Sequence, residues 1–147
     1  MIALGCDHAG FELKQFIIKH LEDRGIEYKD YGTYSTDSVD YAVYAEKTAR
    51  AVAGGECTLG LLFCGTGVGI SMAANKVRGI RAACCSDMFS AEMTRRHNDA
   101  NILCLGGRVV SPEKAVELVD IFLDTPFSGE DRHARRIAQI TELENRF

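Results

Sequence analysis

Short, almost continuously apolar segments alternate along the chain with longer segments in which apolar residues recur at a helical period. The continuous runs predict strands buried on both faces, at Ile2–Cys6, Ile26–Tyr31, Leu59–Cys64, Arg81–Cys85 and Asn101–Leu105. The periodic segments predict helices, at Phe11–Arg24, Tyr41–Ala53, Val68–Val77, Phe89–His97, Glu113–Asp124 and Asp131–Asn145. Because strands and helices alternate, we expect an α/β fold with helices on both faces of a five-stranded parallel sheet.

Residues at the predicted ends of helices support these boundaries. Gly25 follows the first helix, Asp40 is suited to cap the second, and Ser111-Pro112 offers an N-cap followed by proline. We find no internal repeat, low-complexity stretch or linker, so we expect a single domain over residues 1–147. In parallel sheets of this kind, ligands bind at the carboxyl ends of the strands.

Composition and charge limit the class of protein. Hydrophobic residues make up 46% of the 147 residues and charged residues 26%, which is typical of a globular domain. The formal net charge of −4 gives no general attraction to nucleic acid. We expect neither a signal peptide nor a membrane span, because the apolar runs are too short. Most of the six cysteines lie in strand-like runs, so we expect reduced thiols and a cytoplasmic protein.

The junction of the third strand and third helix, Cys64 to Gly69, is the best candidate for chemistry. The thiol of Cys64 is predicted beside unpaired N–H groups of a glycine turn and a helix N-terminus, which attract anions and lower thiol pKa values. The alternative is a cysteine that only fills the core. Ile70 stands where a dinucleotide fingerprint needs its third glycine, so a small oxyanion or phosphate is favoured over a nucleotide cofactor.

Other polar residues follow neighbouring strands. Asp7 and His8 follow the first strand, where they could cap the next helix or share an active site with Cys64. Arg108 follows the fifth strand, after two glycines. The four histidines are scattered and no zinc-binding motif occurs, so we expect no metal site.

Two further groups lie away from this edge. His97-Asn98 precede the fifth strand, so within one subunit we expect them toward the opposite edge of the sheet, with His97 serving a neighbouring subunit's site. The simpler alternative is an imidazole that complements the helix dipole. Arg132 and Arg136 share one face of the last helix, which is either solvated or suited to grip a phosphate.

Several segments together resemble the B-type ribose-5-phosphate isomerases, a group that also includes galactose-6-phosphate isomerase. They are Gly5-Cys6-Asp7-His8-Ala9-Gly10, Cys64 to Ser71, Ala74-Asn75-Lys76, Arg96 to Asn101 and Gly107-Arg108-Val109-Val110. The resemblance covers the whole chain. It implies a Rossmann-like three-layer α/β/α sandwich and a homodimer, or a pair of dimers, with active sites at the subunit interface. It also implies interconversion of ribose 5-phosphate and ribulose 5-phosphate through an enediolate, without metal or cofactor.

The resemblance further implies roles for individual residues. Cys64 matches the general base, and Asp7 and His97 match the pair that opens the furanose ring and shuttles the hydroxyl proton. The anion hole matches Thr66 and the backbone N–H groups of Gly65, Gly67, Val68 and Gly69. Sugar contacts match Tyr41 and Asn98, and phosphate contacts match His8, Arg108, Arg132 and Arg136. The last helix would thus bind phosphate, contact the second subunit, or both.

Two positions depart from the family pattern. Ala42 stands where many relatives have proline. Some relatives replace the active-site cysteine by serine and use a nearby glutamate. This chain keeps Cys64 and has Ile70 after Gly69, which indicates the thiol type of enzyme. Two alternatives to a ribose-5-phosphate isomerase stay open. One is an isomerase of galactose 6-phosphate or another six-carbon sugar phosphate, and the other is a regulator that binds a sugar phosphate without converting it.

Overall fold

Five parallel strands form one sheet, in the order β2-β1-β3-β5-β4, in a computed structural model that describes residues 1–147. The strands are β1 (Ile2–Cys6), β2 (Tyr28–Asp30), β3 (Leu59–Cys64), β4 (Ala82–Cys84) and β5 (Ile102–Gly106). The helices are α1 (Phe11–Asp23), α2 (Tyr41–Ala53), α3 (Val68–Ala74), α4 (Met88–Asn98), α5 (Pro112–Asp124) and α6 (Asp131–Arg146). The predicted α/β class and all eleven elements are confirmed.

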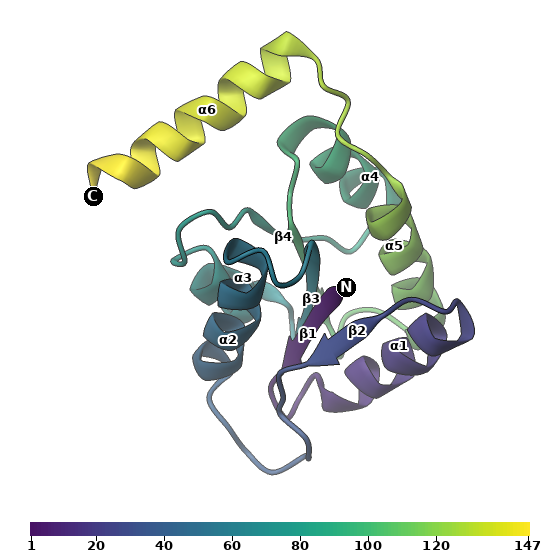
Figure 1. The fold of residues 1–147 in the computed structure, drawn as a ribbon. Helices are drawn as coiled ribbons and strands as arrows, with labels where there is room; N and C mark the ends of the chain where they lie inside the picture. Colours follow the sequence, from purple (N-terminus) through teal and green to yellow (C-terminus); the bar gives the residue numbers. More distant parts are fainter.

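Burial on both faces explains the continuous apolar runs of the central strands. Every residue of β1 and β5 is buried. Figure 1 shows α2 and α3 on one face of the sheet and α1, α4 and α5 on the other, which makes the three-layer sandwich. Two apolar clusters fill the spaces between the layers, so these strands have no polar face.

The edge strands are shorter than predicted. β2 pairs only with β1, and β4 pairs only with β5, over three residue pairs each. An edge strand forms backbone hydrogen bonds to only one neighbour, and the twist of the sheet limits how far that pairing extends. The strands β2 and β4 are therefore shorter than the predicted runs. Asp40 precedes α2 as predicted, but its side chain makes no capping hydrogen bond, whereas Ser111 does cap α5 by accepting the N–H of Lys114.

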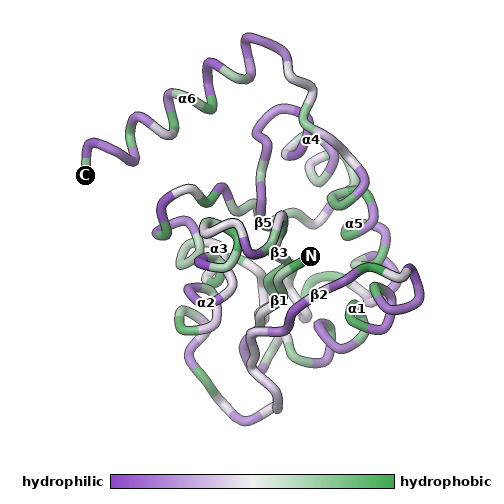
Figure 2. Tube along the Cα trace, viewed as in Figure 1, coloured by the Kyte–Doolittle hydropathy of each residue, from purple (hydrophilic) through white to green (hydrophobic).

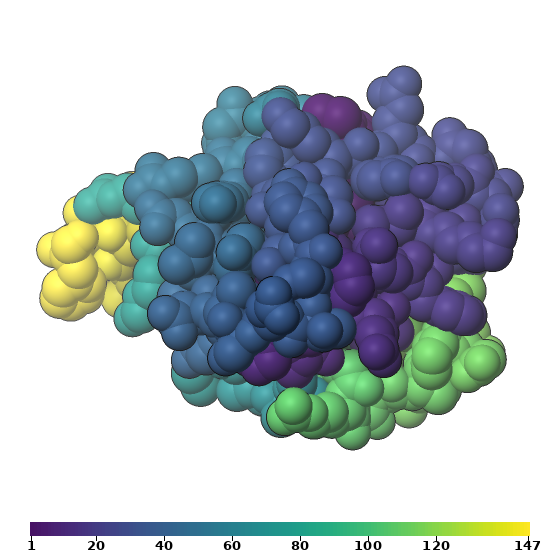
Figure 3. All heavy atoms as spheres, turned by 90° about the horizontal axis from the view of Figure 1, so that it is seen from below, coloured from purple at the N-terminus to yellow at the C-terminus, as the bar shows by residue number.

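Helix α6 stands apart from the sandwich. It crosses one end of the molecule, opposite the loop that joins β2 to α2 (Figure 1), and Figure 2 shows mostly hydrophilic colours along it. Figure 3 views the opposite end, where segments from the start (purple), the first third (blue) and the later part (green) of the chain meet, while the yellow end of α6 projects at one side. No helix of the structure combines the length and apolar character of a membrane span.

Candidate active site

The β3–α3 junction holds the thiol of Cys64 against the backbone. Gly67 has φ of 81°, a left-handed conformation that suits glycine, and its N–H donates to Cys64 Sγ at 3.0 Å. Cys64 is 4% exposed and its side chain joins the core cluster beneath α2 and α3. The thiol is therefore a core side chain whose sulfur meets the glycine turn.

The turn carries backbone donors with no partner in the chain. The N–H groups of Gly65, Thr66 and Gly69 make no internal hydrogen bond. The hydroxyl of Thr66 accepts the N–H of Val68 at 3.3 Å, which leaves the hydroxyl proton free to donate elsewhere. These donors lie within a few residues of Cys64 Sγ, so the junction can stabilise negative charge on a small molecule.

Asp7 and His8 lie next to this junction, because the N–H of Asp7 donates to the carbonyl of Phe63 in β3. Asp7 is buried, and its Oδ1 accepts the N–H groups of Ala9 at 2.9 Å and Gly10 at 3.0 Å. Asp7 therefore closes the turn before α1 with its side chain, but the N-cap residue of α1 is Gly10. Its second carboxylate oxygen has no partner in the chain and stays available.

The loop between β2 and α2 fixes the imidazole of His8. The N–H of Val39 donates to His8 Nδ1 at 3.2 Å, so a neutral ring carries its proton on Nε2. Lys14 anchors the start of the same loop, since its fully buried Nζ contacts Asp30 Oδ1 at 2.7 Å and the Thr33 carbonyl at 2.6 Å. The Nε2–H of His8 makes no hydrogen bond within the chain and stays available as a donor.

Arg108 and Tyr41 close over two glycines of the turn. Arg108 Nη1 lies 3.3 Å from the position that a Cβ on Gly65 would take, and the Tyr41 hydroxyl lies 3.1 Å from the equivalent position at Gly69. The N–H of Arg108 also donates to the Gly65 carbonyl at 3.0 Å. A side chain at either glycine would displace these neighbours. We call the group the Cys64 cluster: Asp7, His8, Tyr41, Cys64, Thr66 and Arg108.

A second cysteine, one of the thiols in the strand-like runs, supports this turn. Cys84, at the end of β4, lies with Sγ 3.0 Å from the Cβ position of Gly67 and donates to the Thr66 carbonyl at 3.6 Å. Burial, and then the neighbouring Cys64, raise the pKa of the Cys84 thiol. Burial also raises the pKa of Cys6 and of Cys85 to about 11, so these thiols stay neutral.

The remaining predicted residues gather at the other end of the sheet. Helix α4 starts after the carboxyl end of β4 and runs back for eleven residues, a distance of about 16 Å at 1.5 Å per residue. The carbonyl of Asn98 accepts from Arg81 Nε, just before β4, at 3.0 Å. His97 and Asn98 therefore lie at the amino edge of the sheet, away from Cys64, as the chain order predicts.

His97 meets a residue of α6 that was not among the predicted site residues. Its ring stacks on His133, with centroids 4.1 Å apart and planes 15° from parallel. Arg132 Nε donates to His133 Nε2 at 3.3 Å, and Glu130 Oε2 lies 3.0 Å from Arg132 Nη2. No local pattern pairs histidines 36 positions apart. We call this group the His97 cluster: His97, Asn98, Glu130, Arg132 and His133.

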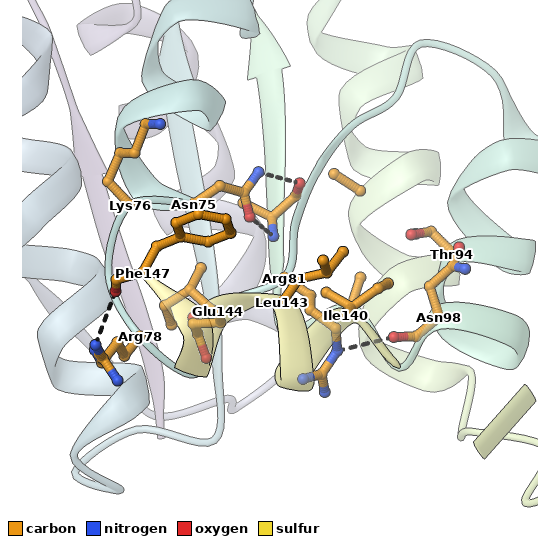
Figure 4. Close-up of a pocket in the computed structure, with 14 residues that line it drawn as sticks. Asn75, Lys76, Arg78, Arg81, Thr94, Asn98, Ile140, Leu143, Glu144 and Phe147 are labelled. Carbon is orange, nitrogen blue, oxygen red and sulfur yellow. Dashed lines mark hydrogen bonds between the residues drawn. The ribbon is translucent and has the colours of Figure 1, made fainter. Parts of the chain in front are cut away.

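Arg136, one turn beyond Arg132, is exposed, and its side chain makes no hydrogen bond or ion pair within the chain. Beneath the second half of α6 lies an open hollow of about 630 Å³ (Figure 4). Glu144 accepts the N–H of Gly79 there, and Arg78 donates to the Phe147 carbonyl at 3.2 Å. Asn98 borders this hollow but no residue of the Cys64 cluster does, so one chain by itself does not enclose both clusters in one site.

Comparison with known proteins gives consistent matches. The Ribose/Galactose Isomerase family model matches residues 2–140. Ribose-5-phosphate isomerase B of Escherichia coli is 52% identical over 145 residues, 99% of this chain and 97% of that protein. Ribose-5-P isomerase B of Listeria innocua is 45% identical over 134 residues, 91% of this chain and 90% of that protein.

Solved structures match over almost the full chain. Ribose-5-phosphate isomerase B of Clostridium thermocellum has a TM-score of 0.97 and 50% identity, covering 99% of this chain and 97% of that one. Ribose-5-phosphate isomerase B of Mycoplasma genitalium, solved with bound ribulose-5-phosphate, has a TM-score of 0.93 and 39% identity, covering 99% and 97%.

Proposed function

Because the chain belongs to the ribose/galactose isomerase family, we propose that it interconverts ribose 5-phosphate and ribulose 5-phosphate. Relatives that are 52% and 45% identical carry the name ribose-5-phosphate isomerase B, which favours the five-carbon sugar over galactose 6-phosphate. The observation that carries the chemistry is the contact of 3.0 Å between the Gly67 N–H and Cys64 Sγ, beside donors that the chain leaves free.

Cys64 acts in this proposal as the base for a carbon-bound proton. In open-chain ribose 5-phosphate, the deprotonated sulfur removes the C2 proton and the C2–H electron pair forms the C1–C2 enediolate. The O2 hydroxyl proton moves to O1, and the same carbon-bound proton, or one from water, then passes from the sulfur to C1, which gives the ketose. The Gly67 N–H favours this role because it stabilises a negatively charged sulfur.

The glycine turn stabilises the enediolate oxygens. Free N–H groups of Gly65, Thr66 and Gly69 and the hydroxyl proton of Thr66 supply donors that need no rearrangement. Each well-placed donor of this kind is worth about 10²–10³-fold in rate. The Tyr41 hydroxyl, which lies over Gly69, is placed to contact the sugar.

Positive charge and N–H donors near the turn fit a phosphate. Arg108 lies over Gly65 and His8 offers Nε2–H, and both belong to the same end of the sheet as Cys64. A guanidinium pairs with phosphate through two parallel hydrogen bonds. Arg132 and Arg136 of α6 offer further guanidinium groups for a phosphate, but within one chain they lie at the opposite end of the sheet from Cys64.

A symmetric dimer would bring the two ends together. We propose that His97, Asn98, Arg132 and Arg136 of one subunit complete the Cys64 cluster of the other, so each site draws on both chains. Exposed apolar side chains on α3 and α6, namely Val68, Met72, Ile140 and Leu143, give such a dimer surface to bury. His97 then works with the free oxygen of Asp7 to open the furanose ring. A cytoplasmic location belongs to this proposal, since all six thiols are unpaired.

A side-by-side assay tests the proposed substrate. The purified protein is given ribose 5-phosphate, galactose 6-phosphate and a second six-carbon aldose 6-phosphate at equal concentration, and ketose formation is followed. We expect the highest kcat/KM with ribose 5-phosphate; a higher value with a six-carbon sugar would assign the chain to the galactose branch. Binding of all three without conversion, and without exchange of substrate hydrogen with solvent, would instead identify a sugar-phosphate-binding regulator.

A further inference from the structure

Helix α6 contacts the rest of the chain through exposed hydrogen bonds near its end and through one buried side chain. Of its sixteen residues only His133 is buried, at 7% exposure. The buried ring does not pack into the apolar core. It lies flat on the imidazole of His97, at the end of α4. A helix that needed only an anchor would gain more from leucine or isoleucine, because burying a polar ring costs free energy unless its nitrogens are paired.

We propose that His133 is a positioning residue for His97: its ring sets the plane of the His97 imidazole for transfer of hydroxyl protons during ring opening. This inference rests on the proposed function, in which His97 contacts substrate in the site of the second subunit. A stack of two nearly parallel rings restricts the rotation of the half-buried His97 side chain. Proton transfer depends on that orientation, and a displacement of about 1 Å can cost about 10²-fold in rate.

The surroundings of His133 explain why a neutral ring suits this position. Burial, then the nearby charges of His97, Arg132 and Arg136, lower the pKa of His133, while Glu130 acts in the opposite direction. A neutral His133 lets His97 accept a proton, whereas two stacked imidazolium rings would repel each other. The Arg132 Nε–H donates to His133 Nε2, which occupies that nitrogen as an acceptor.

The chemistry offers a readout that separates ring opening from carbon chemistry. Ribulose 5-phosphate stays open-chain, because the phosphate occupies the oxygen that would close a five-membered ring. In D2O the enzyme therefore exchanges the C1 hydrogen of ribulose 5-phosphate through Cys64 and the enediolate, with no ring step. Turnover of ribose 5-phosphate, whose dominant form is the furanose, needs the ring to open first.

The experiment compares kcat/KM for ribose 5-phosphate with the rate of C1 exchange in ribulose 5-phosphate, both on the full dimeric enzyme. We expect His133→Ala to lower the first by about 10- to 100-fold and to leave the second near the wild-type rate. His133→Phe keeps a flat ring for stacking and should restore most of the lost turnover. Glu144→Ala, which removes the hydrogen bond from the Gly79 N–H to the other half of α6, should leave the ratio of the two rates unchanged.

Other outcomes would contradict the positioning role of His133. Equal loss of turnover and exchange in His133→Ala, or His133→Phe as slow as His133→Ala, would rule out positioning by stacking. If His133→Ala does not fold, the comparison of His133→Phe with His133→Asn, which lacks an aromatic ring, decides the same point. Absence of both ribose 5-phosphate turnover and C1 exchange in the wild-type enzyme would instead contradict the proposed function itself.

Discussion

The Cys64 cluster and the His97 cluster are built in different ways. The first lies on central strands and is joined by backbone hydrogen bonds, such as Gly107 N–H to the Cys64 carbonyl at 2.8 Å. The second joins the end of α4 to α6 through one ring stack, and its exposed Arg132–Glu130 ion pair lies within the start of α6 itself. Exposed ion pairs contribute little, typically about 0–1 kcal/mol, so we expect the first cluster to be rigid and the second to depend on its surroundings.

This difference assigns the two halves of the chemistry. Removing a proton from carbon needs a base and donors held in fixed positions, which a strand end supplies. Moving protons between oxygens and gripping the phosphate tolerate side chains that a second subunit brings into place. Four changes test this division.

Loss of the thiol should damage both reactions. We expect Cys64→Ala to reduce isomerisation and C1 exchange together, by at least the ~10²–10⁴-fold that a general base contributes. Cys57→Ala is the matched control, because Cys57 is an equally buried thiol in the same core cluster but lies before β3. Near-normal exchange by Cys64→Ala would refute its assignment as the base.

Mixing two inactive variants tests whether the clusters meet between subunits. His97→Ala should lose ribose 5-phosphate turnover by about 10²-fold and keep C1 exchange. When Cys64→Ala and His97→Ala chains are unfolded and refolded together, mixed dimers hold one intact site in two, so about a quarter of wild-type activity returns. If both clusters of a working site came from one chain, the mixture would stay inactive.

The phosphate role of α6 predicts a smaller and selective effect. A charge-assisted hydrogen bond contributes about 1.5–3 kcal/mol, so Arg136→Ala should raise KM for ribose 5-phosphate by about 10- to 100-fold. Turnover of free ribose should change little. Arg135→Ala is the control, since this arginine is also exposed and neighbours the same turn. Equal effects of Arg136→Ala on both sugars would remove the phosphate role.

The smallest effect concerns the docking of α6 at low pH. The pKa of His133 is lowered in the folded chain, so folding favours its neutral form. The contribution of the neutral ring to the stability of the docked helix is therefore present above the unfolded pKa of ~6.5 and is lost as pH falls below it. Amide hydrogen exchange along α6 should therefore speed up relative to β3 as pH falls from 7.5 to 5.5, after correction for the intrinsic exchange rate. His133→Phe should abolish the pH dependence; if it persists, another group governs docking.

Much of the Cys64 cluster was predictable because its parts are local in sequence. A buried strand, a cysteine and three alternating glycines determine a turn in which the Gly67 N–H contacts the sulfur. The continuous apolar runs likewise determined the order and type of the elements, and the family segments determined the class of enzyme. The roles of the individual site residues remain predictions that the variants above test.

Tertiary structure alone decided which distant groups touch. Lys14 lies in a helix where lysine is ordinarily exposed, yet its ammonium is fully buried and holds the loop that orients His8. Stacking of His97 on His133, and the place of Cys84 against the glycine turn, are likewise absent from any local pattern. The periodicity of the sequence indicates which face of a helix or strand is apolar. A contact between two distant polar side chains depends instead on how whole elements pack against each other. Only the folded chain determines such a contact.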